Sequence, residues 1–317
     1  MMKRISLGDS QIAGTSNTIF ITGSPRSGTT LVGKYIGSLD GVEYHYEPPL
    51  LYLLTSMVAA GSIDGGTATD ILRLYLYEDL LVESVHGRRV NLRPEDDSLI
   101  LNTMTWKELN RRWHEIKNRE KAINEISAKG LRLAVKMPSI VNAASFLKEG
   151  FADSKLVVVL RDGRPVVKSI LRKGWMTDES LSREYWPYKL GGSAKTRIPS
   201  FVGEADEESW CSMNEVTRAC FTWRMDAEAT LRVMTDKLFA ANLMVIRYED
   251  ILNNPRKVVA DLSNDLGHPM TDLTEILIKN TAKPSSMTDG PDLESFYGDV
   301  EEGELNRFKA TNALLGY

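Results

Sequence analysis

Cysteine and histidine are scarce in this chain, whose 317 residues include two cysteines and four histidines. Cys211 and Cys220 lie nine positions apart, without a CxxC spacing and without a run of histidines nearby. This pattern favours two buried thiols over a zinc site or a structural disulfide. We therefore expect no metal site, and a chain of this length can bury a sizeable core without one.

Long hydrophobic runs are also missing. The first 17 residues carry charges but no apolar stretch of signal-peptide length, and the longest apolar run, at residues 50–60, is interrupted by Tyr, Thr and Ser. A membrane span needs about 20 consecutive apolar residues. We therefore expect a cytoplasmic protein without a transmembrane segment.

Neither sign of charge dominates the composition. The chain has 43 Asp and Glu against 39 Lys and Arg, which gives a formal net charge of −4 at pH 7. Such a balance provides no overall attraction for nucleic acid or an anionic membrane, so any anion-binding site must be local. No internal repeat or linker stands out, and we predict a single domain over residues 1–317.

Short apolar runs alternate with amphipathic stretches along the chain. The apolar runs predict strands at residues 18–21, 42–46, 131–136, 155–160 and 243–248. Strands separated by helices form a parallel sheet that binds ligands at the carboxyl ends of its strands. The predicted fold class is therefore α/β, with a P-loop-like central parallel sheet of about five strands and helices on both faces.

Capping residues predict the ends of several helices. Asp70 is the expected start of one helix, and Thr105 with Glu108 has capping-box spacing at the head of another helix that ends at Gly130. These helices lie between the second and third predicted strands. They form a predicted helical insertion at about residues 50–130.

The strongest chemical signal lies between the first strand and the next helix. Its residues are Gly23, Ser24, Pro25, Arg26, Ser27, Gly28, Thr29 and Thr30. The glycines have the spacing of a phosphate-binding P-loop, GxxxxGK[ST], in which backbone N–H groups and a helix N-terminus surround an anion. Thr29 stands in the place of the P-loop lysine, and Arg26 supplies the cation. We interpret the loop as an anion site for something other than MgATP; the alternative is a glycine-rich turn that only caps a helix.

A second group of polar residues follows the fourth predicted strand. Asp162 can cap the helix that begins there, Pro165 suits its first turn, and Ser169 returns to the helix face of Pro165 four residues later. Arg161 and Ser169 are therefore candidates for binding one phosphate together. The alternative is a solvated arginine and a core-facing serine.

The segment GSPRSGTTL resembles the 5′-phosphosulfate loop of sulfotransferases that use 3′-phosphoadenosine 5′-phosphosulfate (PAPS), especially the carbohydrate and tyrosylprotein branches and their bacterial relatives. The resemblance implies that residues 24–30 hold the 5′ end of PAPS. It implies that Arg161 and Ser169 hold the 3′-phosphate, with Lys173 as a second cation.

Transfer of a sulfuryl group to a hydroxyl requires a base that takes the acceptor's proton. In the carbohydrate and tyrosylprotein branches this base is a glutamate on the second strand, which implies Glu47 here. His45 lies two residues earlier, on the same face of a strand, and is the rival base or a partner. The resemblance also implies that Lys136, before Pro138, lies near the transferred group and neutralises the leaving oxygen. The alternative for Lys136 is an exposed lysine at a strand end.

These inferences predict an enzyme, a PAPS-dependent O-sulfotransferase that works by in-line displacement without a metal. The resemblance favours a carbohydrate or glycolipid acceptor, followed by a small-molecule alcohol, and we expect no nucleic-acid partner. An aromatic-rich loop at about residues 173–209 is the predicted variable acceptor loop. Two alternatives are a P-loop kinase that uses ATP and a catalytically silent nucleotide-binding protein. The sequence does not indicate an oligomeric state.

Overall fold

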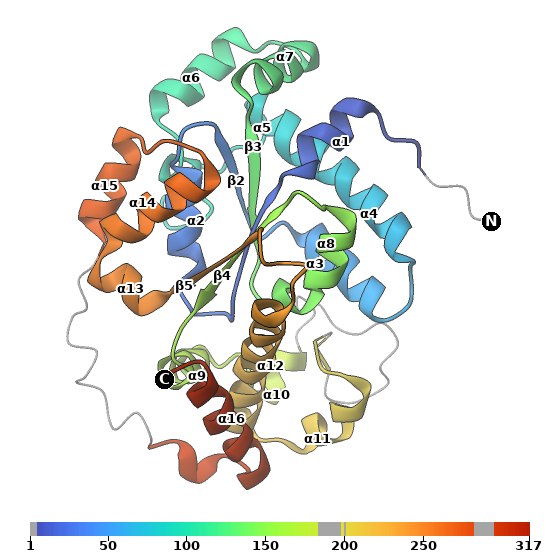
Figure 1. Ribbon diagram of the computed structural model, residues 1–317, viewed down its shortest axis with the longest axis vertical. Helices are drawn as coiled ribbons and strands as arrows, with labels where there is room; N and C mark the ends of the chain where they lie inside the picture. The colour runs from blue at the N-terminus through green and yellow to red at the C-terminus, as the bar shows by residue number, and fades with distance from the viewer. Residues whose placement is uncertain (1–4, 183–197, 200, 282–294) are drawn as a thin grey trace.

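The computed structural model describes residues 5–182, 198–199, 201–281 and 295–317. These residues form a five-stranded sheet in which every pairing is parallel. The strands are β1 (Ile19–Thr22), β2 (Val42–Tyr46), β3 (Arg132–Lys136), β4 (Lys155–Leu160) and β5 (Leu243–Arg247). The predicted α/β class and the five predicted strands are confirmed. The strand order is β2-β3-β1-β4-β5, so that β1 lies in the middle (Figure 1).

The central strand β1 is fully covered on both faces. Phe20 lies in register with Val135 of β3 and Leu156 of β4, and its side chain points to one face of the sheet. Ile19 and Ile21 point to the opposite face. This arrangement explains why the strand reads as a continuous apolar run, as expected for a parallel sheet that is buried on both sides.

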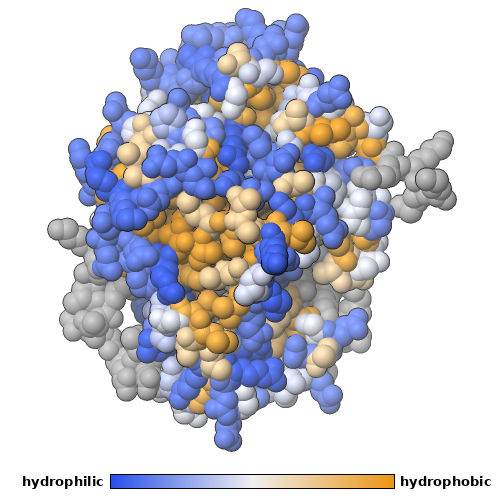
Figure 2. All heavy atoms as spheres, in the orientation of Figure 1, coloured by the Kyte–Doolittle hydropathy of each residue, from blue (hydrophilic) through white to orange (hydrophobic). Residues whose placement is uncertain are grey.

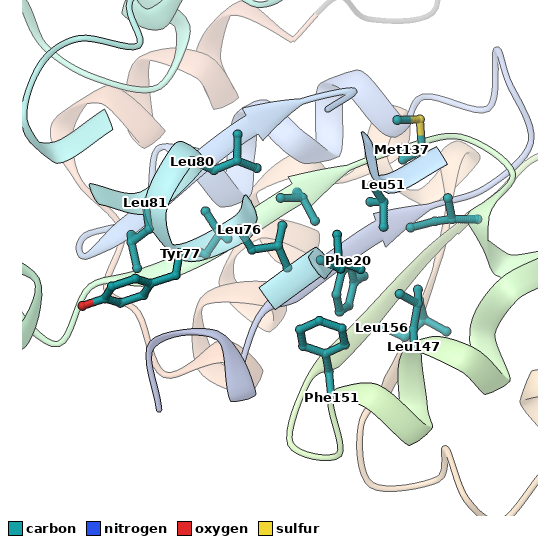
Figure 3. Packing of buried hydrophobic residues seen from close by; sticks show 14 of the residues in the cluster. Phe20, Leu51, Leu76, Tyr77, Leu80, Leu81, Met137, Leu147, Phe151 and Leu156 are labelled. Atoms are coloured by element: carbon teal, nitrogen blue, oxygen red, sulfur yellow. The ribbon is translucent and has the colours of Figure 1, made fainter. Parts of the chain in front are cut away.

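One face of the sheet is covered by the helices on the right of Figure 1. They are α1 (Asp9–Ser16), α3 (Pro49–Ala59), α4 (Gly65–Leu74) and α8 (Ala144–Gly150). The rings of Phe20 and Phe151 meet edge to face in this core, with centroids 5.4 Å apart, and Leu147 and Leu156 pack beside them (Figure 3).

The opposite face is covered by α2 (Thr29–Gly37), α14 (Pro255–Leu266) and α15 (Asp272–Asn280), with α13 (Tyr248–Asn253) nearby (Figure 1). Helix α2 follows β1 directly, and its buried residues Val32, Tyr35 and Ile36 pack against the β1 face that carries Ile19 and Ile21. Helix α2 is therefore fixed along its length, and its first turn lies at the carboxyl end of β1.

A third layer of helices lies beyond the carboxyl ends of the strands (Figure 1). It contains α9 (Gly163–Arg172), α10 (Asp178–Ser182), α11 (Glu207–Ser212), α12 (Glu215–Thr235) and α16 (Glu302–Leu314). Trp223 of α12 packs on Phe308 of α16 at 4.9 Å between ring centroids. Arg224 and Glu304 form a buried ion pair between the same helices, with 2.6 Å between Nε and Oε1.

The helices of the segment between β2 and β3 begin at places other than those predicted. Helix α4 starts after Asp64, whose side chain accepts a hydrogen bond of 2.9 Å from the backbone N–H of Thr67. Asp70 lies inside this helix and is buried, so its predicted capping role is wrong. The two glycines after Asp64 hid the true start, because glycine is a poor helix former. The chain continues through a π-helical stretch, Tyr75–Val82, and α5 (Glu83–Val85).

The predicted helix from Thr105 to Gly130 is two helices, α6 (Trp106–Glu115) and α7 (Arg119–Lys129). Thr105 caps α6, since its hydroxyl accepts a hydrogen bond from the backbone N–H of Glu108. The prediction of one continuous helix is wrong because Asn118 caps a new one and accepts a bond of 2.9 Å from the N–H of Lys121. Gly130, with a φ of 57°, ends α7 as predicted.

The surface in view combines apolar and hydrophilic areas. Apolar residues gather in the middle of this face, and hydrophilic residues surround them (Figure 2). None of the helices in the described ranges is both long enough and apolar enough to cross a membrane.

Candidate active site

The Gly23–Thr30 loop bends sharply between β1 and α2, and two glycines make the bend possible. Gly23 has a φ of 146°, and a Cβ atom there would lie 2.3 Å from the carbonyl oxygen of Val159. Gly28 has a φ of 94°, and a Cβ atom there would lie 2.3 Å from the ring of Tyr248. Neither position has room for a side chain, so the loop backbone lies directly against β4 and Tyr248.

The loop presents free backbone donors at the start of α2. Among the described residues, no acceptor binds the N–H groups of Thr29 and Thr30, the first two residues of the helix. The N–H groups in the first turn of a helix have no partner within the helix and favour an anion. The loop can therefore surround an anionic group, as its glycine spacing predicts.

Arginine side chains from two elements meet beside the loop. Nε of Arg26 donates a hydrogen bond of 2.9 Å to Oγ of Ser169 on α9. Nη1 of Arg161, at the end of β4, donates one of 2.8 Å to the carbonyl oxygen of Arg26, and its guanidinium lies 4.2 Å from the centroid of the Tyr248 ring. Ser169 thus contacts Arg26; the sequence prediction was that Arg161 and Ser169 bind one phosphate together. Burial lowers the pKa of Arg161, and a bound anion would favour its charged form.

A carboxylate and an ammonium group face each other at the ends of β2 and β3. The Lys136 ammonium forms an ion pair with Oε1 of Glu47, and the Glu47 N–H donates a bond of 2.8 Å to the Lys136 carbonyl oxygen. The Lys136 side chain is buried and lies over the ring of Tyr46, with 4.4 Å from Nζ to the ring centroid. Burial lowers the pKa of Lys136, while the Glu47 carboxylate opposes that shift.

The loop, the arginines and this ion pair surround one cavity of about 340 Å³, which we call the loop cavity. Eight of the residues singled out in the sequence line it: Pro25, Arg26, Gly28, Thr29, Thr30, Glu47, Lys136 and Arg161. The carboxyl ends of β1, β2, β3 and β4 supply or lead directly into these residues. The topology therefore brings together four segments that are far apart in the sequence, as expected for an open parallel sheet.

Besides Ser24 and Ser27 of the loop, three predicted site residues do not line the loop cavity: Ser169, Lys173 and His45. Lys173 is the exposed residue after the last turn of α9. His45 lines a neighbouring cavity, and burial lowers its pKa to about 4. The expected shared face of His45 and Glu47 is absent because Glu47 lies beyond the end of β2 and has a φ of 44°, which interrupts the alternation of the strand.

Two residues of the loop itself do not line the cavity. Ser24 and Ser27 are buried. Asp226 of α12 is also buried, and its carboxylate accepts hydrogen bonds from the Ser139 hydroxyl (2.9 Å) and the Asn142 amide (2.7 Å). Ser139 in turn donates its backbone N–H to the carbonyl oxygen of Gly23 at 3.0 Å. Asp226 thus supports the segment that holds the loop, and burial raises its pKa to about 7.

Some residues that line the loop cavity were not predicted as site residues from the sequence. Tyr248 is the last residue of the fifth predicted strand, and its ring touches both Gly28 and Arg161. Lys34 and Asp97 pair at 2.9 Å on the cavity wall, and no local pattern marks Asp97. Trp175, with its ring 5.9 Å from the Arg26 guanidinium, lies in the predicted acceptor loop.

Part of that predicted loop, residues 183–197 and 200, lies outside the described residues. Within the described ranges, no group of three or more His, Cys, Asp or Glu side chains is placed to hold a metal ion.

Comparison with known protein families identifies one match. Residues 18–272 match the family described as the Sulfotransferase family. No curated protein matches the chain.

Several solved structures are similar to the chain. The sulfotransferase domain of the Synechococcus PCC 7002 olefin synthase is 16% identical, with 95% of each chain covered and a TM-score of 0.48. Sulfotransferase STF1 from Mycobacterium tuberculosis H37Rv is 16% identical, with 95% of this chain and 79% of that one covered and a TM-score of 0.45. A sulfotransferase from Alicyclobacillus acidocaldarius is 14% identical, with 94% and 95% covered and a TM-score of 0.40.

Proposed function

Because this chain belongs to the sulfotransferase family, we propose that it transfers a sulfuryl group from PAPS to the hydroxyl group of an acceptor. The observation that carries the proposal is the Glu47–Lys136 pair, which lines the loop cavity together with the anion-binding loop. A base and a cation at one side of an anion site are what sulfuryl transfer to an oxygen atom requires.

The donor supplies an activated sulfuryl group, and the residues of the loop cavity fit its two anionic ends. The free N–H groups of Thr29 and Thr30 and the side chain of Arg26 suit the 5′-phosphosulfate. Arg161 and Ser169, which each form a hydrogen bond with Arg26, suit the 3′-phosphate. All these groups are hydrogen-bond donors or cations, as expected for a site that binds a multiply charged anion.

In the proposed reaction, Glu47 takes the proton of the acceptor hydroxyl as the acceptor oxygen bonds to sulfur. The bond from sulfur to the 5′-phosphate oxygen breaks at the same time, and the electron pair stays on that oxygen. Lys136 and Arg26 neutralise the charge that develops there. As in phosphoryl transfer through a loose transition state, the protein contributes mainly positioning and charge stabilisation.

The kinase alternative has no support. Thr29 occupies the place where a P-loop kinase carries the lysine that reaches the β- and γ-phosphates. The silent-protein alternative differs from the proposal only in whether the Glu47 carboxylate acts as a base.

The test is transfer of ³⁵S from labelled PAPS to a panel of sugars, glycolipids and simple alcohols, with Glu47→Gln beside the wild type. A positioned base contributes about 10²- to 10⁴-fold, so we expect Glu47→Gln to lose roughly that factor in turnover. Affinity for adenosine 3′,5′-bisphosphate should stay within about threefold of the wild-type value, since the base does not bind the nucleotide.

The control is Glu78→Gln, which also removes a carboxylate from an ion pair, with Arg119, but lies away from the loop cavity. Glu78→Gln should keep wild-type turnover. Near-normal turnover in Glu47→Gln would remove Glu47 from the role of base. Nucleotide binding without transfer to any acceptor of the panel would favour the silent protein.

A further inference from the structure

Tyr46 and Lys136 lie next to each other at the ends of two neighbouring strands. They are register partners in the parallel pair of β2 and β3, and each is the last residue of its strand. The Lys136 ammonium lies over the face of the Tyr46 ring, with 4.4 Å from Nζ to the ring centroid. Both residues line the loop cavity. The cation that the proposed reaction uses at the leaving oxygen therefore lies on an aromatic ring.

Lys136 carries its charge in a place that disfavours it. Its side chain is only 3% exposed, and burial lowers its pKa. The Glu47 carboxylate opposes this shift, but its side chain is 36% exposed, so water screens part of the attraction. In the proposed reaction Glu47 also takes up a proton and loses its charge, at the moment when the leaving oxygen needs the ammonium. Lys136 therefore needs a stabilising partner that does not change during transfer.

The other charged groups near Lys136 do not meet this need. Asp97 favours the ammonium, but its side chain is 54% exposed and forms an ion pair with Lys34 at 2.9 Å. Arg26 lies nearby and lowers the pKa of Lys136. The remaining titratable side chains among the described residues that line the loop cavity are those of Arg161 and Tyr248. Neither of these two is an anion at neutral pH.

The Tyr46 ring has the properties that a constant partner needs. The face of an aromatic ring attracts a cation and carries no charge that titrates. Burial and the nearby Glu47 carboxylate raise the pKa of the Tyr46 hydroxyl, so the side chain stays neutral around pH 7. The strand register fixes the ring beside Lys136, and the 2.8 Å bond from the Glu47 N–H to the Lys136 carbonyl oxygen joins the two backbones at this point.

We propose that Tyr46 is a positioning residue for sulfuryl transfer: its ring holds the Lys136 ammonium in place and charged while the Glu47 carboxylate takes up the acceptor's proton. The hydroxyl group is not required for this role, so phenylalanine can replace the tyrosine and an aliphatic residue cannot. The inference rests on the proposed function, since it assigns Lys136 to the leaving oxygen. The effect of the ring on the Lys136 ammonium can nevertheless be measured without an acceptor.

The experiment compares Tyr46→Phe, which keeps the ring, with Tyr46→Leu, which keeps an apolar side chain without a ring. The pKa of Lys136 is measured by NMR on protein that contains ¹³C-labelled lysine, and the Lys136 signal is identified by its loss in Lys136→Arg. Tyr46→Phe should keep the wild-type pKa within about 0.3 pH units. Tyr46→Leu should lower it by about 0.5–1.5 pH units, which corresponds to the strength of a cation–π interaction with a desolvated cation.

Turnover is measured on the same variants with ³⁵S-labelled PAPS as a function of pH. The alkaline fall in turnover should move to lower pH in Tyr46→Leu by the same amount as the pKa of Lys136, and it should stay in place in Tyr46→Phe. The matched control is Tyr297→Leu. Nζ of Lys309 lies over the Tyr297 ring, 4.5 Å from its centroid, and neither residue lines the loop cavity. This control should leave both the Lys136 pKa and the pH profile unchanged.

An unchanged Lys136 pKa in Tyr46→Leu would overturn the inference, and so would an equal fall in Tyr46→Phe or in Tyr297→Leu. If Tyr46→Leu does not fold, pentafluorophenylalanine at position 46 decides, since it keeps the shape of the phenylalanine ring and reverses the sign of the charge on its face. It should lower the Lys136 pKa, and a value equal to that of Tyr46→Phe would contradict the proposal. Absence of transfer by the wild type, with a Lys136 pKa that follows the ring, would instead count against the proposed function.

Discussion

The Nε atom of Arg26 donates a 2.9 Å hydrogen bond to the Oγ atom of Ser169, which lies 143 residues further along the chain. The bond joins the loop after β1 to the helix after β4. Arg161 adds a second link, because it donates a hydrogen bond to the backbone carbonyl of Arg26. The two motifs that we propose to bind phosphate are therefore in direct contact, and a change in either should alter how nucleotides bind.

Arg161→Ala should weaken binding of adenosine 3′,5′-bisphosphate by roughly tenfold to a hundredfold, because a hydrogen bond to a charged group contributes about 1.5–3 kcal/mol. Affinity for adenosine 5′-phosphate, which lacks the 3′-phosphate, should change much less. Calorimetric titration measures both. The control is Arg164→Ala, whose guanidinium pairs with Asp162 and does not line the loop cavity. Equal losses for the two nucleotides would contradict the assignment of Arg161 to the 3′-phosphate.

Gly28→Ala should reduce affinity for adenosine 3′,5′-bisphosphate by more than tenfold and lower the melting temperature. The added Cβ atom would lie 2.3 Å from the Tyr248 ring, so the loop must move. Gly130→Ala is the matched control: Gly130 also has a positive φ, of 57°, but nothing lies within 4 Å of its added Cβ atom. It should lower stability by about 1 kcal/mol and leave nucleotide affinity intact. Unchanged affinity in Gly28→Ala would argue against a tightly fitted loop.

In the proposed mechanism, Lys136 should give turnover an alkaline limit. Burial lowers its pKa from the ordinary value of 10.5, so the ammonium loses its proton at a lower pH than a free lysine does. Since only the charged form stabilises the leaving oxygen, turnover should fall as the pH rises through that lowered pKa. Arginine stays charged to much higher pH, so turnover of Lys136→Arg should not fall over this pH range. If turnover of Lys136→Arg falls at the same alkaline pH, a group other than Lys136 causes the fall.

Asp226 makes stability depend on pH. Burial raises its pKa from 3.8 to about 7 in the folded chain. Between these values the folded state binds more protons than the unfolded state, so the free energy of unfolding should decrease as the pH rises from about 4 to about 7. Asp226→Asn removes this titration and should gain stability relative to the wild type over that range.

Denaturant unfolding at pH 4, 5.5 and 7 measures the effect. Asp236→Asn, at the exposed end of the same helix, is the control and should follow the wild-type curve. A constant difference between Asp226→Asn and the wild type at all three pH values would contradict the linkage.

The sheet and the anion-binding loop could be predicted from the sequence because their signals are local. A buried parallel strand reads as an apolar run, and the spacing of Gly23 and Gly28 reflects the backbone of the loop itself. The cap of α6 at Thr105 is equally local. The start of α4 at Asp64 was missed because the glycines that follow suppressed the helical pattern, and the break at Asn118 was missed because the apolar stripe continues across it.

The remaining site residues depend on contacts across the fold. Tyr248 joins the site because β5 lies beside β4, and Asp97 joins it because the segment 89–103 returns to β2. Asp226 lies in the middle of a helix and supports a segment that is distant in the sequence. No spacing rule predicts such partners. Glu47 likewise does not share a strand face with His45 because its φ is 44°, and the sequence does not predict that backbone angle.

The proposed sulfuryl transfer requires a site that recognises a nucleotide by phosphates at both ends. Calorimetric titration of the wild-type protein with adenosine 3′,5′-bisphosphate, adenosine 5′-phosphate and MgATP tests this claim. We predict that the bisphosphate binds at least tenfold more tightly than adenosine 5′-phosphate, with no requirement for Mg²⁺. Tighter, Mg²⁺-dependent binding of ATP, or equal affinity for the two adenosine phosphates, would contradict it.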